Sequence, residues 1–296
     1  MSIAQLDARE KFAKANGLTI CHQTFGAPSD PPIVLVMGLG AQMILWEDGL
    51  CQSLAERGYF VVRFDNRDVG RSSQILTPPP DLARVMAGLE SLKAPYTLDD
   101  MARDTVGLMD ALGLSKAHLV GASMGGMIAQ LVAIHFPERV RTLTSIMSTT
   151  GERGLPPPKP EVWAAMTAPP PLTVEAFIET NVRVARLLRG YSDADEDAAA
   201  RARATRAAAR GLNPAGGARQ MAAIIASGSR REALAGVKAP TLVIHGADDP
   251  LVPVEAGKAT ARAIPGAKLV VLERMGHTLP RAQWPTIVDA IAAHAR

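Results

Sequence analysis

The feature that most constrains the fold of this 296-residue chain is a serine set among glycines between two apolar runs. The segment reads Gly121-Ala122-Ser123-Met124-Gly125-Gly126, with Ala117–Val120 before it and Met127–Val132 after it. This pattern predicts a strand, a sharp turn and a helix. Glycines on both sides of the serine let the strand and the helix pack closely, because no Cβ stands between them. The serine hydroxyl is then held clear of both elements and can face a substrate.

Two later segments could supply the groups that activate a serine hydroxyl, which is a poor nucleophile at neutral pH. One predicted strand ends just before Asp248 and Asp249, and another ends shortly before His277. Serine, acid and histidine thus follow in the chain order that such a strand–turn–helix site requires. His277 would accept the proton of Ser123, and an aspartate would fix the histidine tautomer. His245, which also ends a strand near the acid loop, is the main rival of His277.

The chain resembles the α/β-hydrolase superfamily along nearly its whole length. The matching segments are Val34–Gly40, Phe64–Ser72, Gly121–Gly126, His135–Val140, His245–Pro253 and Gly276-His277. Within the superfamily it is most similar to the small esterases typified by aclacinomycin methylesterase. Those proteins share the Val-Met-Gly opening and the Asp-x-Arg-Asp-x-Gly-Arg-Ser loop.

The resemblance assigns roles to individual positions. It implies that the triad acid is Asp249, directly before the proline position, and that Asp248 is a turn residue. It makes His245 a structural residue. It also implies that the backbone N–H groups of Leu39 and Met124 form an oxyanion hole. The family commonly has His-Gly where this chain has Met37-Gly38, so a side chain that often braces this loop is missing.

Strands and helices alternate from about Ile33, which predicts a mostly parallel sheet covered on both faces, with an antiparallel edge near Leu18–Phe25. This α/β core is expected to comprise residues 1–147 and 232–296. Residues 148–231 break the pattern and are expected to form an inserted helical cap. Helical stretches are expected at Val174–Leu188, Asp195–Arg210 and Ala215–Gly228, after prolines at 156–158, 160 and 169–171 that favour neither helix nor sheet.

The sequence also suggests roles for a charged loop and for the apolar side chains of the expected cap. The charged loop Asp65–Ser72 is interpreted as a brace for neighbouring loops rather than as a substrate contact. Side chains of the cap could line a pocket over the site or pack within the cap. These are Trp163, Met166, Phe177, Leu187 and Leu188.

Composition excludes several other classes of protein. A net charge of +3 with 4% aromatic residues lacks the basic, aromatic-studded surface of a nucleic-acid-binding protein. Cys21 and Cys51 give neither a disulfide framework nor metal-ligand spacing, and no Gly-rich phosphate loop is present. We therefore expect no metal and no cofactor. Met1–Asn16 lacks the apolar core of a signal peptide and no run is long enough to span a membrane, so a cytoplasmic protein without membrane contact is expected.

These observations favour a serine carboxylic-ester hydrolase, either a carboxylesterase or a methylesterase, that acts on a small-molecule ester through an acyl-enzyme. The same Ser-His-Asp parts also serve carbon–carbon bond hydrolases and serine perhydrolases or haloperoxidases, so those activities stay open. A different class also stays open, namely a receptor on the same fold that binds a ligand without turnover.

Overall fold

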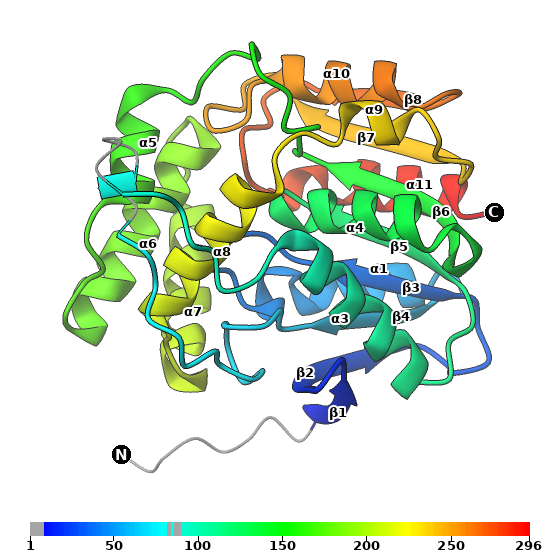
Figure 1. Cartoon of the computed structure of the whole chain (residues 1–296), viewed down its shortest axis with the longest axis horizontal. Helices are drawn as coiled ribbons and strands as arrows, with labels where there is room; N and C mark the ends of the chain where they lie inside the picture. Colours follow the sequence, from blue (N-terminus) through cyan, green and yellow to red (C-terminus); the bar gives the residue numbers. More distant parts are fainter. Residues whose placement is uncertain (1–8, 82–83, 86–89) are drawn as a thin grey trace.

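Among the residues that the structure describes, eight strands form one sheet at the centre of the molecule (Figure 1). The structure, a computed structural model, describes residues 9–81, 84–85 and 90–296, so residues 1–8, 82–83 and 86–89 of the expected core lie outside it. The strands in chain order are β1 (Lys11–Ala15), β2 (Leu18–Phe25), β3 (Pro32–Val36), β4 (Phe60–Phe64), β5 (Ala117–Ala122), β6 (Val140–Ile146), β7 (Thr241–Gly246) and β8 (Lys268–Leu272).

The strands lie side by side in the order β1-β2-β4-β3-β5-β6-β7-β8. β2 is antiparallel to both of its neighbours, and the pairs from β4 to β8 are parallel. The expected mostly parallel sheet with an antiparallel edge is therefore confirmed. Because parallel strands point the same way, the loops that follow β3 to β8 gather at one edge of the sheet.

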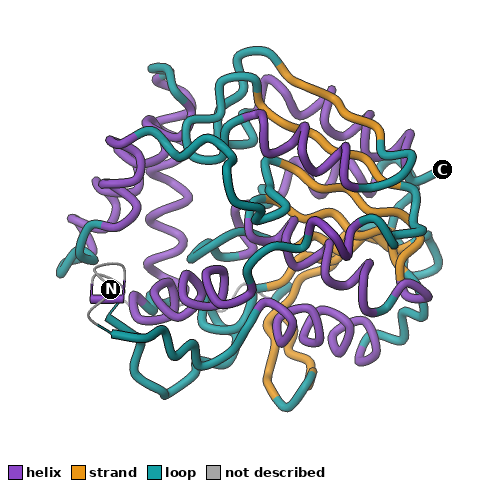
Figure 2. Tube along the Cα trace, turned by 45° about the horizontal axis from the view of Figure 1, so that its top comes forward, coloured by secondary structure: helices purple, strands orange, loops and turns teal. Residues whose placement is uncertain are grey.

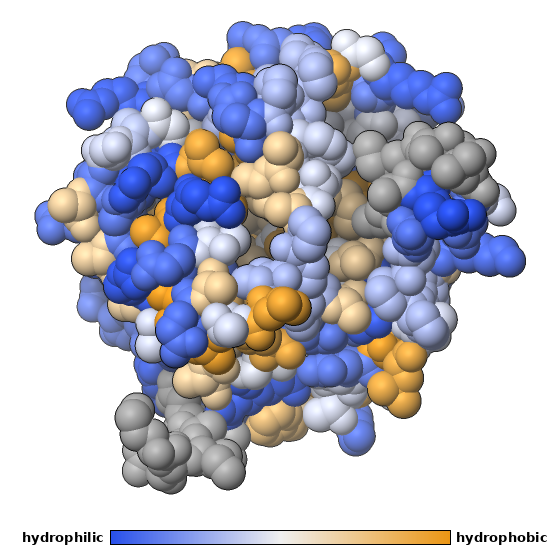
Figure 3. Space-filling model, turned by 90° about the vertical axis from the view of Figure 1, so that its left-hand side faces the viewer, coloured by the Kyte–Doolittle hydropathy of each residue, from blue (hydrophilic) through white to orange (hydrophobic). Residues whose placement is uncertain are grey.

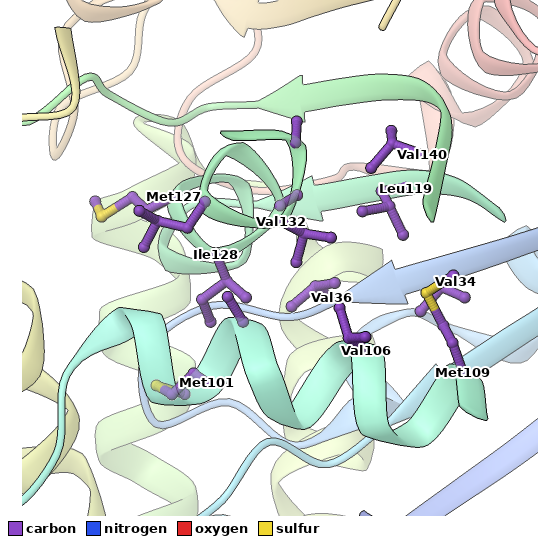
Figure 4. Close-up of a cluster of buried hydrophobic side chains, with 14 of the residues drawn as sticks. Val34, Val36, Met101, Val106, Met109, Leu119, Met127, Ile128, Val132 and Val140 are labelled. Atoms are coloured by element: carbon purple, nitrogen blue, oxygen red, sulfur yellow. The ribbon is translucent and has the colours of Figure 1, made fainter. Parts of the chain in front are cut away.

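Helices cover both faces of the sheet, as Figure 2 shows. Helices α1 (Asp48–Ala55) and α11 (Trp284–His294) pack together over one face, and α3 (Leu98–Ala111), α4 (Met124–His135) and α10 (Val254–Ala263) pack over the other. Successive side chains of a strand point to opposite faces. Accordingly Val34 and Val36 of β3 meet α3 and α4 (Figure 4), whereas Ile33 and Leu35 pack on the side of α1 and α11. Every residue of β3 is buried, which explains its continuous apolar sequence.

Four helices between β6 and β7 stand at the edge of the sheet where the strands end (Figure 1). They are α5 (Pro160–Thr167), α6 (Val174–Arg189), α7 (Ala194–Arg210) and α8 (Pro214–Ser227), and a short α9 (Arg231–Leu234) leads back to β7. We call α5 to α8 the helical segment. Three of these helices match the predicted stretches. The fourth, α5, corrects the interpretation of Pro160 as a helix breaker: the proline starts this helix, where its missing N–H costs no hydrogen bond.

Buried ion pairs join the helical segment to the loop that follows β4. The guanidinium of Arg210 on α7 lies 2.7 Å from the Asp65 carboxylate and 2.6 Å from that of Glu10. Arg219 on α8 binds both oxygens of Asp68, at 2.8 and 2.9 Å. Both aspartate side chains are fully buried. The charged loop thus braces its surroundings as interpreted, and its main partners come from the helical segment.

The Asp68 carboxyl is ionised because its partners outweigh burial. Burial alone raises the pKa of Asp68, but hydrogen bonds from Arg219, the Ile75 N–H and Tyr96 lower that pKa below its ordinary value. Burial likewise opposes the charge of Arg210, yet Asp65 and Glu10 raise the pKa of its guanidinium. A buried pair of this kind contributes little net stability, but removal of one partner leaves a charge that is costly to keep out of water.

We therefore expect Arg210→Met to lower the free energy of unfolding by about 3 kcal/mol or more, because Asp65 and Glu10 lose their shared cation. Urea unfolding followed by circular dichroism measures this change. Arg201→Met is the matched control on the same helix, since Arg201 pairs with Glu179 at the surface, where half or more of each side chain is exposed. An equal loss of stability in both variants would contradict the anchoring role of Arg210.

Candidate active site

The turn between β5 and α4 holds Ser123 in an unusual backbone conformation. Its φ and ψ are 56° and −122°, a region that costs a residue with a side chain about 1–3 kcal/mol. Close packing keeps the turn in place. A Cβ on Gly121 would collide with the carbonyl of Gly125, and a Cβ on Gly125 would collide with the carbonyl of Val36 at the end of β3. The two glycines are therefore required by the approach of β5, α4 and β3.

Two hydrogen bonds, one to the end of β6 and one from the loop after it, fix this turn. The Ser123 N–H donates to the carbonyl of Ile146 at 2.9 Å, and the Ser148 hydroxyl donates to the carbonyl of Ser123 at 2.8 Å. Ser148 lies two residues after the end of β6 and is buried. Sequence reasoning did not single out Ser148, because a serine after a strand carries no distinctive motif.

Three side chains predicted from the sequence meet at this edge of the sheet. The Nε2 atom of His277 lies 2.9 Å from the Ser123 hydroxyl, and its Nδ1 atom lies 2.7 Å from an Asp249 oxygen. Asp249 and His277 are buried, and Ser123 is half-buried. A hydroxyl, an imidazole and a carboxylate joined in this order can activate the hydroxyl as a nucleophile.

Asp249 sits in a loop that favours its ionised form. Its second oxygen accepts hydrogen bonds from the N–H groups of Leu251 at 3.0 Å and Val252 at 2.8 Å. Burial raises the pKa of Asp249, but the nearby His277, a contact with His245 and the backbone hydrogen bonds outweigh it. The pKa of the carboxyl is therefore held well below its usual range.

The rival residues occupy other positions. Asp248 is exposed, and its N–H donates to the carbonyl of Met275. His245 is fully buried and its Nε2 donates to the carbonyl of Val252 at 2.7 Å, while Asp249 lies 3.5 Å away. Since a carbonyl only accepts, this contact puts the proton of neutral His245 on Nε2. His245 thus supports the acid loop, in agreement with its interpretation as a structural residue.

The loop after β3 lies against the serine. An added Cβ on Gly38 would stand 3.1 Å from the Ser123 Cβ and 3.6 Å from its hydroxyl oxygen, so Leu39 follows directly beside the serine. Met124 is the first residue of α4, where N–H groups have no partner within the helix. The structure therefore brings the loop that holds Leu39 against Ser123, and Met124 follows Ser123 directly.

Two amides hold this loop, Asn66 from the predicted brace and Gln220, which sequence reasoning missed. Asn66 donates to the carbonyl of Met37 at 2.9 Å. Gln220 on α8 accepts from the Gly40 N–H at 2.8 Å and donates to the carbonyl of Arg67 at 2.7 Å. Gln220 is fully buried. It braces a loop that lacks the usual histidine, from a position far along the chain, which no local pattern could have indicated.

A cavity of about 270 Å³, which we call the central cavity, opens at Ser123 and His277. Trp163, Met166 and Leu188 of the predicted pocket residues line it. Phe177 instead packs in a small cluster with Met43 and Ile44, and Leu187 faces a separate hollow near Pro250. The space-filling view of this end of the molecule shows a hollow near its centre, with apolar and weakly polar residues around it (Figure 3).

Two further observations concern what the described residues could bind or enter. Among them, no three or more His, Cys, Asp or Glu side chains are grouped so that they could hold a metal ion. No helix in the described ranges combines the length and apolar character needed to cross a membrane.

Comparison with known proteins gives consistent matches over nearly the whole chain. The model of the alpha/beta hydrolase fold family matches residues 31–280. Rhodomycin D methylesterase DnrP of Streptomyces peucetius is 32% identical over 94% of this chain and 95% of its own length. A hydrolase structure from Pseudomonas aeruginosa aligns with a TM-score of 0.72 and 25% identity, covering 98% of this chain and 99% of that one.

A third match supports the fold alone. A meta-cleavage product hydrolase from Pseudomonas fluorescens aligns with a TM-score of 0.74 at 21% identity, covering 96% of each chain. The sheet order, the strand–turn–helix at Ser123 and the family match agree. The chain belongs to the α/β hydrolase fold family, and its likeness to small methylesterases of this family is confirmed.

The packing at the turn leads to a test of the glycine requirement. We expect Gly125→Ala to lower the free energy of unfolding by more than about 2 kcal/mol, because its Cβ displaces the end of β3. Gly217→Ala on α8 is the control, since a Cβ there meets nothing within 4 Å. It should stabilise the protein by about 0.4–1 kcal/mol. Thermal and urea unfolding measure both variants, and a well-folded Gly125→Ala protein would argue against tight packing at the turn.

Proposed function

We propose that this protein is a serine carboxylic-ester hydrolase that works through an acyl-enzyme. The observation that carries the proposal is the hydrogen-bonded chain from the Ser123 hydroxyl through His277 to Asp249, at 2.9 and 2.7 Å. Likeness over 94% of the chain to a protein named as a methylesterase supports esters as the substrate class.

The geometry supports the following sequence of steps. The Ser123 oxygen attacks the ester carbonyl carbon while His277 Nε2 takes the hydroxyl proton. Asp249 stabilises the imidazolium that forms, and its low pKa keeps it ionised as a partner for this charge. The carbon–oxygen bond to the alcohol then breaks, and His277 gives the proton to the departing oxygen. Water, activated in turn by His277, hydrolyses the acyl-enzyme and restores Ser123.

Charge that develops on the carbonyl oxygen needs hydrogen-bond donors fixed in advance. We assign this task to two backbone N–H groups, that of Leu39 in the loop against Ser123 and that of Met124 directly after it. Because these donors belong to the backbone, methionine in place of the usual histidine at position 37 leaves them intact. Asn66 and Gln220 keep the Leu39 loop in place through its carbonyl and N–H groups.

We further propose that residues 148–231 act as a cap over this site. Trp163, Met166 and Leu188 from this part of the chain stand in the wall of the central cavity. The His277 N–H also donates to the carbonyl of Leu188 at 2.7 Å, so the cap contacts the histidine loop directly. A cap in this position excludes water from the reacting centre and shapes the ester that fits.

Hydrolysis of p-nitrophenyl esters from acetate to decanoate tests the proposed activity. Ser123→Ala should lower kcat by about 10⁴-fold or more, because the nucleophile is removed while the fold remains. Circular dichroism of the variant provides the control for folding. Activity near that of the wild type would show that Ser123 is not the nucleophile. Absence of turnover on every ester would contradict an esterase and favour a carbon–carbon hydrolase or a binding protein.

A pair of neighbouring substitutions tests the acid. Asp249→Asn should lower kcat by about 10⁴-fold, because the amide no longer holds the histidine in the required tautomer. Asp248→Asn should leave kcat nearly unchanged, since that side chain is exposed. The two variants carry the same chemical change one residue apart, so the comparison needs no further control. The reverse order of effects would move the acid to Asp248.

A further inference from the structure

Two more cavities adjoin the central cavity, one on each side of Ser123. The first, about 190 Å³, shares five lining residues with it, namely Met37, Leu45, Met147, Leu188 and His277. The second, about 580 Å³, shares four others, namely Leu39, Trp163, Met166 and Met221. We call the first the inner pocket and the second the outer cleft. They have no lining residue in common, so the three cavities form a series with Ser123 in the middle.

The inner pocket and the outer cleft differ in the residues that form their walls. The outer cleft is lined by prolines, alanines, methionines and Ile225, and it lies between α5 and α8. The inner pocket also has apolar walls, but it reaches the side chains of Glu47, Glu196 and Arg203. Glu47 accepts from Arg203 at 2.5 Å and from Arg281 at 2.6 Å. Carboxylate oxygens have further lone pairs, so they can also accept hydrogen bonds from hydroxyl groups.

The position of His277 indicates which of the two cavities receives the alcohol half of the ester. Its imidazole must hand a proton to the departing alcohol oxygen, so the alcohol leaves on the side of His277. His277 lines the central cavity and the inner pocket, whereas Leu39, one of the assigned oxyanion donors, lines the central cavity and the outer cleft. The alcohol half of an ester therefore points toward the inner pocket, and the acyl half toward the outer cleft.

We propose that the substrate is an ester of a bulky apolar acid with a compact hydroxylated alcohol, the acid in the outer cleft and the alcohol in the inner pocket. A cavity of about 150 Å³ holds one benzene ring. The inner pocket is therefore larger than methanol requires, and a glycerol-sized alcohol can fill it and reach Glu47. The inference rests on the proposed ester hydrolysis and adds which half of the ester each cavity receives.

Two alanines, each half-buried, allow matched tests of this assignment. Ala185 on α6 lines the inner pocket, and Ala218 on α8 lines the outer cleft. Neither lines the central cavity. Leucine at either position narrows one cavity by the same volume and leaves Ser123 and His277 in place.

The experiment measures kcat/KM by titration of the released acid. One series compares methyl with 2,3-dihydroxypropyl hexanoate, and the other compares 2,3-dihydroxypropyl acetate with the decanoate. We expect the wild type to prefer the dihydroxypropyl ester over the methyl ester. Ala185→Leu should reduce that preference about tenfold, the discrimination that a methylene-sized difference in a pocket can give. Ala218→Leu should instead reduce the preference for decanoate over acetate about tenfold.

Several results would overturn the assignment. A wild-type preference for the methyl ester would contradict the hydroxylated alcohol. If Ala185→Leu changed the acyl preference and Ala218→Leu the alcohol preference, the acid would lie in the inner pocket and the alcohol in the outer cleft. Unchanged preferences in both variants would show that neither cavity holds the substrate. Unfolding midpoints control for folding, and Val184→Phe replaces Ala185→Leu if the leucine variant does not fold. Hydrolysis that Ser123→Ala abolishes supports the esterase whichever result is found, whereas no hydrolysis at all overturns both proposals.

Discussion

Two buried carboxylates in the loop after β4 determine how the helical segment sits over the sheet. Asp65 and Asp68 are fully enclosed, so each needs a cation and hydrogen-bond donors to remain charged. Arg210 and Arg219 are those cations, and they come from two successive helices of the segment. Apolar contacts alone tolerate sliding, whereas bidentate ion pairs fix direction and distance. The volumes of the three cavities therefore depend on these contacts.

The site itself follows from the direction of the strands. β5, β7 and β8 run parallel, so the turns that follow them meet at one edge although they are far apart in the chain. Ser123, Asp249 and His277 each come from one of these turns. The helical segment then closes the same edge, which places a half-buried serine between an apolar cleft and a pocket with a charged rim.

Local patterns predict much of this arrangement. The turn at Ser123 follows from its glycines and from the apolar runs beside it, and a strand, Lys268–Leu272, ends shortly before His277 as predicted. The order of serine, acid and histidine then indicates which side chains meet, and the structure brings those three together. Their catalytic roles stay predictions until the variants are measured. The family likeness chose Asp249 over Asp248, which the residues alone left open, and the contact with His277 agrees with it.

Other features depend on contacts that no local pattern contains. Pro160 appears in a proline-rich stretch, and only the path of the chain after it decides that a helix starts there. Leu187 and Leu188 are neighbours of the same type, but consecutive helix residues point about 100° apart, so one faces the central cavity and the other does not. Ion pairs such as Asp65 with Arg210 join residues 145 positions apart, and their partners cannot be matched from composition.

The amide of Gln220 links two parts of the protein that are usually considered separately. It belongs to a helix that lines the outer cleft, yet its hydrogen bonds hold the loop after β3 beside Ser123. Exchange of the helical segment with that of a relative would thus change more than the shape of the cavities. A hybrid protein whose α8 lacked an amide side chain at position 220 would lose the hydrogen bond from the Gly40 N–H. Substrate range and turnover are therefore coupled in this chain. Replacement of the helical segment changes both at once.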